Sequence, residues 1–339
     1  MDMIRIGIIC PSEIALRRFL PALVQLPDFK FVGVAIANKT EWQGANDNII
    51  NSEKDKAREF ITRYGGKFFD SYSQIVNSKE IEAIYLPLPP ALHYKWAKLS
   101  LLAGKHILVE KPATTSLKCT TELITLASNN KLAIHENYMF AFHNQLSAIN
   151  DIIQNGEIGD VRLYRISFGF PRRGSNDFRY NKTLGGGALL DCGGYTIKYA
   201  SMLLGETVKI VYAHSNYIDG FDVDMFGSAA LINEHGITVQ IAYGMDNSYK
   251  CNLEVWGSRG CLTTGRVLTA PAGFVPEVKL EIGNEKEARK LSACDAFVKS
   301  IQRFQECIKD ESVRKSNYGV ISKQAELVDE FIEKAKLNG

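Results

Sequence analysis

The sequence lacks an excess of charge of either sign, because 40 lysines and arginines face 38 aspartates and glutamates among its 339 residues. A net charge of +2 gives no reason to expect a nucleic acid or a membrane surface as partner. No apolar run approaches the roughly 20 residues that span a bilayer. The first residues enter an apolar run directly, without the layout of a signal peptide. We therefore expect no nucleic-acid partner and no membrane association.

Paired cysteines are also missing. The chain has seven cysteines, an odd number, and no two of them have the spacing of a CxxC motif. This pattern indicates neither a disulfide framework nor a zinc site, so we expect no bound metal. A reducing, cytoplasmic compartment fits such cysteine usage best. The length exceeds that of a usual single core, which predicts two domains.

The glycines of a dinucleotide-binding turn are missing between the first predicted strand and the helix after it, where such a turn is expected. The apolar stretch Met3–Cys10 predicts a buried strand, and a helix with Ser12 as its N-cap follows at once. The G-x-G-x-x-G glycines would fall on Cys10, Ser12 and Ala15, which are all small, while Pro11 removes one amide donor. We expect the turn to contact the pyrophosphate of a dinucleotide. Its contacting residues would be Cys10, Pro11, Ser12, Glu13 and Ile14.

A carboxylate is likewise missing after the second predicted strand, Phe31–Ala37. Folds of this kind that prefer NAD carry Asp or Glu there, bonded to the ribose hydroxyls. Here the strand is followed by Asn38, Lys39 and Thr40. A cation with small polar neighbours would accept a 2′-phosphate, so we expect NADP(H) to be favoured over NAD(H). The alternative is an ordinary strand-end turn with a solvated lysine.

Strands and helices alternate through residues 1–136, which predicts a parallel, doubly wound α/β sheet of the Rossmann type. Leu86, Pro87 and Leu88 end one of its strands and are expected to contact the cofactor, because ligands bind outside the carboxyl ends of such strands. His93, just after this loop, is expected to start or pack a helix. The further predicted elements are helices Glu53–Tyr64, Ser73–Asn77, Tyr94–Ala103 and Leu117–Ser128, and strands Phe68–Asp70, Ala83–Leu86, Ile107–Val109 and Leu132–His135.

The triplet Glu110-Lys111-Pro112 ends the strand Ile107–Val109. Pro112 fixes its own φ and favours an extended Lys111, which aims the lysine at whatever occupies the crevice. We expect Lys111 to act on a bound substrate and Glu110 to anchor Lys111 or the cofactor ribose. The alternative for this triplet is a pair of solvated turn charges.

The order of these pieces resembles the glucose-fructose oxidoreductase / inositol dehydrogenase family, called Gfo/Idh/MocA. The departures are Cys10 and Ser12 at glycine positions, Pro90 where asparagine is common, and Ala141 where arginine is common. The matching pieces are Ile14-Ala15, Leu20-Pro21-Ala22-Leu23, Tyr85-Leu86-Pro87-Leu88-Pro89, Leu92-His93, Gly104-Lys105-His106, Glu110-Lys111-Pro112, Glu136, Tyr138-Met139, Phe142-His143, Gln145, Gly185-Gly186-Gly187-Ala188-Leu189, Asp191, Gly193 and Tyr195.

The resemblance implies a second, α+β domain at residues 137–339 for substrate binding and oligomerisation, with a large, mostly antiparallel open sheet. It also implies a homodimer or homotetramer. The residues agree independently, because strand-like runs alternate with Gly, Asn and Asp turns. The predicted strands are Val161–Phe170, Val208–Tyr217, Met225–Ile232, Thr238–Tyr243 and Tyr249–Trp256, and the predicted helices are Ala188–Leu204, Ala296–Ile308 and Tyr318–Ala335.

The resemblance places the substrate beside the helix that begins at Ala188. Asp191 and Tyr195 lie four residues apart, so they share one face of it. Many family members carry histidine at the latter position. A tyrosine looks like the branch with glucose-fructose oxidoreductase, dihydrodiol dehydrogenase and the sugar-nucleotide 3-ketoreductases.

These residues could support hydride transfer to a carbonyl, for which Tyr195 would donate the proton. A free tyrosine has a pKa of about 10, which a nearby cation such as Lys111 would lower. Lys111 would also stabilise the developing alkoxide. Asp191 would orient the substrate or the lysine, and Tyr138 would contact the substrate.

The loop before the glycine triplet predicts a phosphate-bearing substrate. Arg172, Arg179 and Tyr180 are the expected contacts, because guanidinium groups bind phosphate bidentately and an aromatic ring stacks on a base or sugar. The alternative is that the arginines of this loop are solvated, or that they pair with Asp177 and with a neighbouring subunit. We expect an oxidoreductase acting on a nucleotide-linked keto-hexose. A free-sugar or cyclitol dehydrogenase, and a non-catalytic sugar-sensing member of the family, stay open as alternatives.

Overall fold

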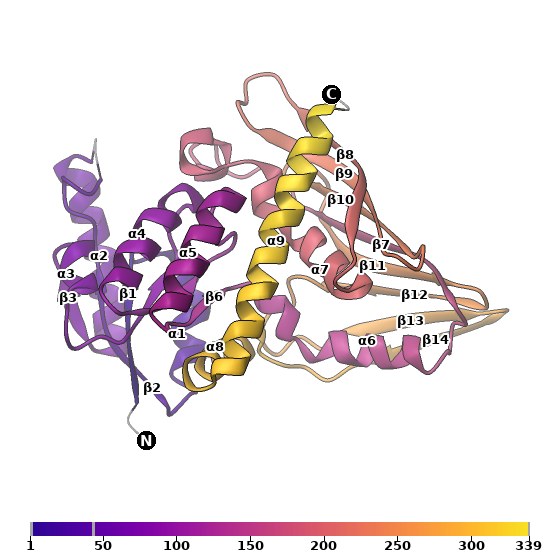
Figure 1. The fold of residues 1–339 in the computed structure, drawn as a ribbon, viewed down its shortest axis with the longest axis horizontal. Coiled ribbons are helices and arrows are strands. Elements are labelled where there is room, and N and C mark those ends of the chain that lie inside the picture. The colour runs from indigo at the N-terminus through magenta and orange to yellow at the C-terminus, as the bar shows by residue number, and fades with distance from the viewer. Residues whose placement is uncertain (1–2, 43–44, 338–339) are drawn as a thin grey trace. The chain divides into compact units, whose positions relative to one another are not determined.

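The computed structural model describes residues 3–42 and 45–337, which form two compact units (Figure 1). The first comprises Met1–Asn137 and Ser300–Ser322, and the second comprises Tyr138–Lys299 and Lys323–Gly339. The boundary expected from sequence, 136/137, assigned every later residue to the second domain. The first unit takes up the later segment because Asn317 and Tyr318 donate hydrogen bonds to carbonyls of Ile134 and Leu132.

The first unit contains a parallel sheet with the strand order β3-β2-β1-β4-β5-β6, so the expected Rossmann fold is confirmed. The order reverses between β1 and β4, and ligands bind in the crevice at such a switch point. The strands are β1 Ile4–Ile9, β2 Phe29–Ala35, β3 Lys67–Phe69, β4 Ala83–Leu86, β5 His106–Val109 and β6 Ile134–Glu136.

Helices alternate with these strands, and two of them start at least four residues earlier than expected. The helix predicted from Glu53 begins at Asp47, because the side chain of Asn46 accepts the amide of Ile49 as an N-cap. The helix predicted from Tyr94 begins at Pro90, a residue that suits the first helical position. The helical elements are η1 Ala15–Phe19, α1 Leu20–Leu23, α2 Asp47–Tyr64, α3 Tyr72–Val76, α4 Pro90–Leu102 and α5 Leu117–Asn129.

The second unit contains a sheet of eight described strands in the order β14-β13-β12-β11-β7-β10-β9-β8. Only the described pair β7 and β10 is parallel, so the expected large, mostly antiparallel sheet is confirmed. The strands are β7 Val161–Gly169, β8 Lys209–Tyr217, β9 Asp224–Ile232, β10 Thr238–Gly244, β11 Lys250–Gly257, β12 Gly260–Gly265, β13 Glu277–Ile282 and β14 Glu285–Lys290. Sequence reasoning missed β12, β13 and β14, since β12 is bounded by glycines and β14 is charged along most of its length.

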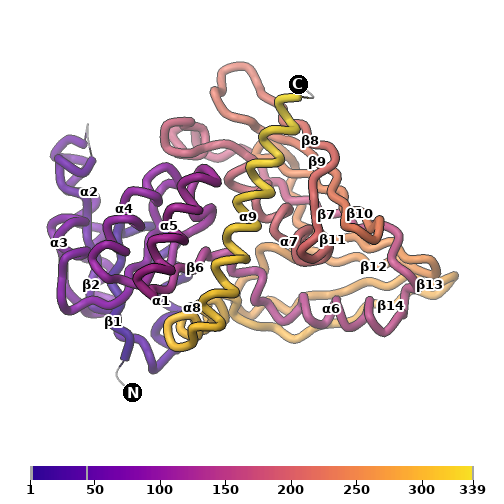
Figure 2. Tube along the Cα trace, viewed as in Figure 1, coloured from indigo at the N-terminus to yellow at the C-terminus, as the bar shows by residue number. Residues whose placement is uncertain are grey.

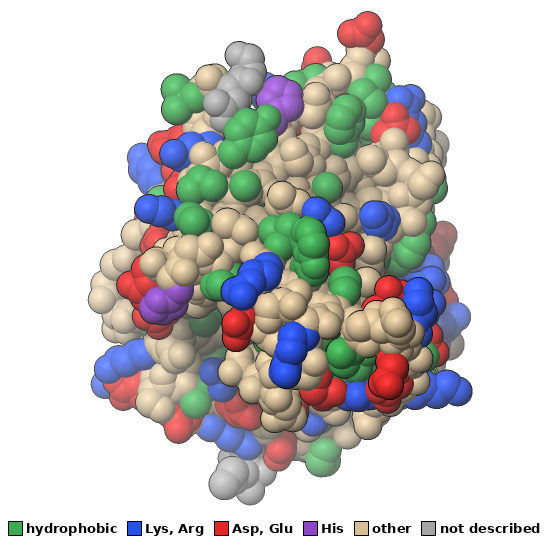
Figure 3. All heavy atoms as spheres, turned by 90° about the vertical axis from the view of Figure 1, so that its right-hand side faces the viewer, with side chains coloured by type: hydrophobic (Ala, Val, Ile, Leu, Met, Phe, Trp, Pro, Cys, Tyr) green, Lys and Arg blue, Asp and Glu red, His purple; other side chains and the backbone are tan. Residues whose placement is uncertain are grey.

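Helix α7 lies against β7 and β10 on one face of this sheet. On the opposite face Arg165 bonds Gln240 and Glu254 from the two neighbouring strands, and Trp256 is exposed beside them. Figure 3 views the molecule from the right-hand side of Figure 1 and shows hydrophobic side chains interspersed with charged ones. The helical elements of the remaining chain are η2 Met139–Phe142, α6 Asn144–Gln154, η3 Phe178–Tyr180, η4 Lys182–Leu184, η5 Leu189–Gly193, α7 Gly194–Leu204, α8 Ala296–Lys309 and α9 Glu311–Leu337.

Helix α9 is shared, because its first part, up to Ser322, belongs to the first unit and the remainder to the second (Figure 2). It begins seven residues before the expected start at Tyr318. Within residues 3–42 and 45–337, no helix has both the length and the apolar composition that crossing a bilayer requires.

The packing of Trp96 in the core of the first unit can be tested by substitution. Trp96 on α4 is 2% exposed and meets the ring of Tyr72 edge-on at 5.1 Å between centroids. We expect Trp96→Ala to lower the free energy of unfolding by about 3–5 kcal/mol, the usual cost of emptying such a site. Urea unfolding followed by circular dichroism measures it. Trp42→Ala, at a position 42% exposed, is the matched control and should change stability by less than about 1 kcal/mol. Equal losses in both variants would contradict this description of the core.

Candidate functional site

The turn after β1 keeps the shape of a dinucleotide-binding turn without its glycines. Cys10 has a φ of 78°, the left-handed conformation that glycine adopts without strain. Its amide donates to the carbonyl of Ala35 at 3.0 Å, and its own carbonyl accepts from Ser12 at 2.9 Å. The hydroxyl of Ser12 accepts the amide of Ala15 at 3.2 Å, as the expected N-cap does. The turn therefore forms, although Pro11 offers no amide.

The side chains of this turn divide into buried and exposed ones. Burial raises the pKa of the Cys10 thiol to about 12, so the thiol stays neutral and is no nucleophile. Glu13 and Ile14 are exposed at the start of the helix, where a pyrophosphate is expected to lie. Phe19 and Leu23 are buried and belong to the apolar face of the helix, whereas Ile14 lies outside it.

The turn after β2 contains a carboxylate, Glu41, that is held by backbone amides. Glu41 accepts the amides of Asn38, Tyr72 and Ser73 at 3.1, 2.9 and 2.8 Å, so it caps the start of α3. Lys39 is exposed and pairs with Asp47 at 2.7 Å. An exposed pair of this kind is weak and opens readily for a stronger anion. The tip thus presents a cation where an NAD-preferring fold presents a carboxylate.

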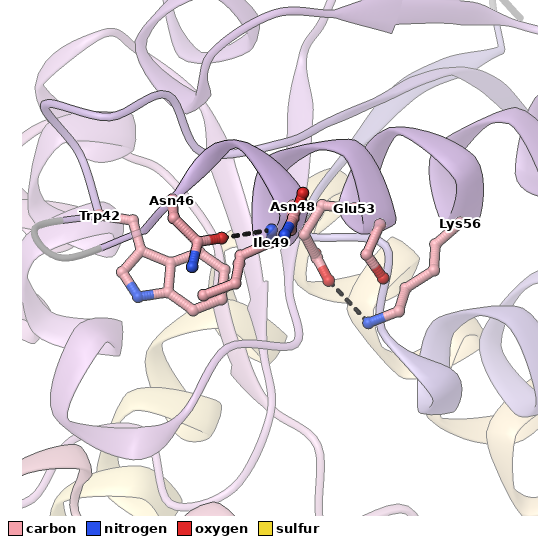
Figure 4. A pocket seen from close by; sticks show the side chains of 7 residues that line it. Trp42, Asn46, Asn48, Ile49, Glu53 and Lys56 are labelled. Atoms are coloured by element: carbon pink, nitrogen blue, oxygen red, sulfur yellow. Dashed lines mark hydrogen bonds and ion pairs between the residues drawn. The ribbon is translucent and has the colours of Figure 1, made fainter.

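A hollow of about 420 Å³ lies next to this tip, between Trp42 and the first turns of α2 (Figure 4). The figure shows the indole of Trp42 at one end and the ion pair of Glu53 with Lys56, 2.6 Å long, at the other. An open indole and amide side chains suit a flat, polar ring such as a nucleobase. The lining residues are Trp42, Asn46, Asn48, Ile49, Ser52, Glu53 and Lys56.

At the carboxyl end of β5, Glu110 is fixed by two neighbours. Its carboxylate accepts from the hydroxyl of Tyr85 at 2.6 Å and from the amide side chain of Asn137 at 2.7 Å. Burial raises its pKa, although these bonds act in the opposite direction. Its amide donates to the carbonyl of Leu86 at 3.1 Å, so the ends of β4 and β5 stand side by side. Lys111, the next residue, is half-buried at the same edge.

His93 joins the two loops at this edge. Its ring nitrogens lie 2.8 Å from the carbonyl oxygen of Pro112 and 2.7 Å from that of Leu88. The side chain is fully buried, which agrees with the packing role expected for it. Because a neutral imidazole carries one N–H, it donates to one of these carbonyls, and only the imidazolium donates to both. His93 therefore links the loop after β4 to the turn that carries Lys111.

In the second unit, Asp191 lies in the π-helical turn η5, and Tyr195 follows in α7. Single π-helical turns inside helices are frequent at functional sites. Arg179 donates through Nε to Asp191 at 2.7 Å and through Nη1 to Asp177 at 3.0 Å. Two carboxylates thus share one guanidinium. Arg179 was expected to bind phosphate, but this geometry favours a role in orienting Asp191.

The ring of Tyr195 is surrounded by aromatic rings of its own unit. Tyr138, Phe140 and Phe168 lie at 5.1, 5.6 and 5.4 Å between centroids. Tyr138 is 1% exposed, and its hydroxyl lies where a side chain at Gly194 would overlap it. Its expected contact with the substrate stays a prediction. What the structure gives it is a supporting contact with Tyr195.

The other two residues expected to bind substrate lie on the loop before η5. Arg172 pairs with Asp246 at 2.7 Å, and its guanidinium stands over the ring of Phe221. The hydroxyl of Tyr180 accepts the amide of Arg173 at 2.8 Å, and its ring also packs on Phe221. The structure therefore brings Arg172 and Tyr180 together around one aromatic ring, on a surface that also carries Arg173.

Sequence reasoning did not find Glu41 or the linking role of His93, while the pairing of Arg179 with Asp177 was one of its alternatives. Glu41 and His93 act through contacts between distant segments, for which a single sequence gives no signal. The only available sign was the position of Glu41, three residues beyond the end of the tip Asn38.

Two family descriptions match the chain. Residues 4–138 match the "Oxidoreductase family, NAD-binding Rossmann fold", and residues 146–263 match the "GFO/IDH/MocA C-terminal domain". The chain is 36% identical to a dTDP-3,4-didehydro-2,6-dideoxy-alpha-D-glucose 3-reductase of Actinomadura kijaniata, over 90% of this chain and 87% of the relative. It is 34% identical to an enzyme of the same name from Streptomyces violaceoruber, over 98% and 96% of the two chains.

Solved structures match over the same extent. A 3-ketoreductase from Actinomadura kijaniata, crystallised with NADP and TDP-benzene, superposes with a TM-score of 0.90, at 34% identity over 98% of both chains. Variants of that enzyme with a tyrosine changed to phenylalanine, or a lysine changed to alanine, match as well. An aldose-aldose oxidoreductase from Caulobacter crescentus superposes with a TM-score of 0.85 at 17% identity over 100% and 99% of the chains, which shows a shared fold.

The burial of His93 predicts a pH-dependent stability. Burial lowers its pKa to about 4, with Lys111 acting in the same direction and the two carbonyl contacts opposing. Since the folded pKa lies below the unfolded value of about 6.5, this stabilising contribution is complete above pH 6.5 and is lost as the pH falls towards 4. The free energy of unfolding should fall between pH 7 and pH 5 in the wild type. We expect this fall to be smaller in His93→Gln, by up to about 2 kcal/mol.

Denaturant unfolding at both pH values measures this difference. Burial also lowers the pKa of His106 to about 4, so part of the pH dependence should persist in the variant. The exposed residue His235, changed to Gln, is the matched control and should behave like the wild type. An unchanged pH dependence in His93→Gln would show that His93 is not held neutral in the folded state.

Proposed function

Because the chain belongs to the Gfo/Idh/MocA family of oxidoreductases, we propose that it transfers hydride between NADP(H) and a ring carbonyl of a nucleotide-linked keto-hexose. The observation that carries this proposal is the full-length similarity, at 34–36% identity, to enzymes named as dTDP-sugar 3-reductases. The retained Lys111, Asp191 and Tyr195 support a working enzyme.

The first unit fits a dinucleotide cofactor. The turn at Cys10 adopts the required left-handed conformation, and the strand order creates a switch-point crevice beside it. The cofactor, when bound, supplies the hydride. Lys39 would exchange its exposed pair with Asp47 for a 2′-phosphate, because Glu41 is bonded to the amides of α3 and does not compete for the cation. The hollow at Trp42 would take the adenine.

In the proposed chemistry, Tyr195 donates the proton that the substrate oxygen needs as its carbon accepts hydride. Lys111 stabilises the negative charge that develops on this oxygen. In the related 3-ketoreductase, the lysine and the tyrosine replaced in the variants lie the same number of positions apart as Lys111 and Tyr195. This equal spacing supports the two assignments.

Asp191 would hold a substrate hydroxyl beside Tyr195. Its bond to Arg179 fixes the direction of the carboxylate, so we propose an orienting role rather than proton transfer. For Glu110 we likewise propose a supporting role. Its carboxylate accepts hydrogen bonds from Tyr85 and Asn137, which suits a fixed support beside Lys111.

The diphosphate of the substrate would bind Arg172 together with Arg173, and its base would stack near Tyr180. Arg172 is bonded to Asp246, and both are partly exposed, so the pair is weak enough to yield to a phosphate. Among the described residues Arg173 makes no ion pair, and its guanidinium stands over the ring of Phe170 at 5.1 Å. This surface therefore suits a nucleoside diphosphate better than a neutral sugar.

A fall in NADPH absorbance on addition of substrate tests the function. The probes are dTDP-3,4-didehydro-2,6-dideoxy-α-D-glucose, a free keto-hexose and an inosose. Turnover of the first alone supports the proposal. Turnover of a free sugar or cyclitol, with no affinity for dTDP by calorimetry, would contradict the proposal and favour a free-sugar or cyclitol dehydrogenase. Binding of sugars without any turnover would make the protein a sensor of the same fold.

The two proposed catalytic side chains can be separated from folding and from cofactor binding. We expect Lys111→Ala and Tyr195→Phe each to lower kcat by on the order of 100-fold, the scale of a lost charge stabiliser or proton donor. The Kd for NADPH, measured by fluorescence, should stay within about twofold, since hydride acceptance and not cofactor binding is affected. Tyr217→Phe, at an exposed position on β8, is the control. Wild-type turnover in Tyr195→Phe would mean that another group donates the proton.

The cofactor preference has its own test. We expect Lys39→Ala to raise the Kd for NADPH by about tenfold, because it removes a charge-assisted bond to the 2′-phosphate. The Kd for NADH should not change. Lys30→Ala, a change at the other end of the same strand, is the matched control. If NADH binds the wild type as tightly as NADPH, and Lys39→Ala has no effect, the preference is wrong.

Self-association and location stay predictions. The open face that contains Arg165 and Trp256 is the surface through which we propose a homodimer or homotetramer to form. All seven cysteines are unpaired, which suits the proposed cytoplasmic compartment.

A further inference from the structure

The helix that carries Asp191 and Tyr195 starts on a carboxylate supplied by a distant strand. The amide of Leu189, the first residue of η5, donates to Oδ2 of Asp224 at 2.8 Å. The amide of Ala188 donates to the same carboxylate. The first amides of a helix have no acceptor within the helix, and a negative charge there is stabilised by the helix dipole. Asp224 thus caps this helix from the first position of β9.

The turn before the helix is shaped around this carboxylate. Gly187 has a φ of 117°, and a side chain on it would overlap Oδ1 of Asp224. The amide of Gly187 donates to the carbonyl of Arg179 at 2.9 Å, and its carbonyl accepts from Asp191 at 3.1 Å. The carboxylate therefore rests on the turn that connects Arg179 with Asp191, the two ends of the ion pair described above.

A third donor completes the set. The hydroxyl of Tyr243, on the neighbouring strand β10, donates to Asp224 and also lies 3.3 Å from the hydroxyl of Ser215. Burial raises the pKa of Asp224 to about 6, and the hydrogen bonds from Leu189 and Tyr243 oppose that rise. Burying this carboxylate costs desolvation free energy. Because its donors come from two elements, the carboxylate fixes the positions of these elements.

We propose that Asp224 is a positioning residue, which holds the start of the helix so that Asp191 and Tyr195 face the substrate in register. The inference rests on the proposed function, because the roles of these two side chains are assigned there. Asp224 itself acts through the backbone of Ala188 and Leu189 and makes no contact with the reacting atoms. Its loss should therefore affect the rate of the chemical step more than the binding of either substrate.

Kinetics of two variants at this position test the role. We expect Asp224→Ala to lower kcat by about 10- to 100-fold, since small displacements of reacting groups have effects of this size, with KM changed far less. Asp224→Asn should recover much of the loss, because its amide oxygen still accepts one N–H. The Kd for NADPH should be unchanged. Asp219→Asn, in the exposed turn before β9, is the matched control. Wild-type kcat in Asp224→Ala overturns the proposal.

Amide hydrogen exchange gives a readout that does not depend on activity. Exchange at Ala188 and Leu189 should accelerate in Asp224→Ala and remain close to wild type in Asp224→Asn and in the control. If Asp224→Ala fails to fold, Tyr243→Phe replaces it; this variant removes one donor and should lower kcat by a smaller factor. If the wild type reduces no sugar nucleotide, the proposed function fails, while the exchange experiment still decides the role of Asp224. Unchanged exchange at Leu189 would refute it.

Discussion

Carboxylates that accept backbone amides hold the functional turns of both units. Glu41 fixes the tip of β2 to the start of α3, and Glu136 accepts the amide of Ala113, directly after the turn of Lys111. Asp224 does the same for the helix of Tyr195. Amides at helix starts and turns have no partner in regular structure, so an ionised acceptor stabilises a particular loop geometry more than a neutral one would. These few bonds fix the turns on which the proposed placement of cofactor and substrate depends.

The sequence predicted the alternating first unit well, because buried parallel strands are continuous apolar runs with clear turn residues between them. The helix boundaries at Asp47 and Pro90 were missed for different reasons. The cap by Asn46 lies in a polar, asparagine-rich stretch, and Pro90 follows other prolines that are equally typical of a loop. In the second unit, β14 could not be predicted, because its Glu, Lys and Arg residues give no hydrophobic pattern. The same charges protect an edge strand from aggregation.

The candidate site was predictable to the extent that it depends on position along the chain. Lys111 at a strand end, and Asp191 one helical turn from Tyr195, follow from periodicity and motif order. Pairing of Arg179 with Asp177 was one of the alternatives from sequence, but its bond to Asp191 did not follow, because Asp191 meets this guanidinium only once the loop is folded. The burial of Tyr138 could not be predicted from the sequence either, because it depends on a close approach to Gly194 that only the tertiary structure creates.

The shared helix α9 has a consequence for how such proteins can be cut and recombined. Asn317 donates a hydrogen bond to the edge strand β6, and Tyr318 donates one to Leu132 just before it. Both donors follow the whole second sheet in the chain. A fragment that ends near Asn137 would leave those carbonyls without their donors and uncover apolar surface that Tyr318 and Ile321 bury. The cofactor-binding half is therefore not a portable module. An exchange between relatives has to carry residues 300–322 along with the N-terminal segment to keep the sheet edge closed.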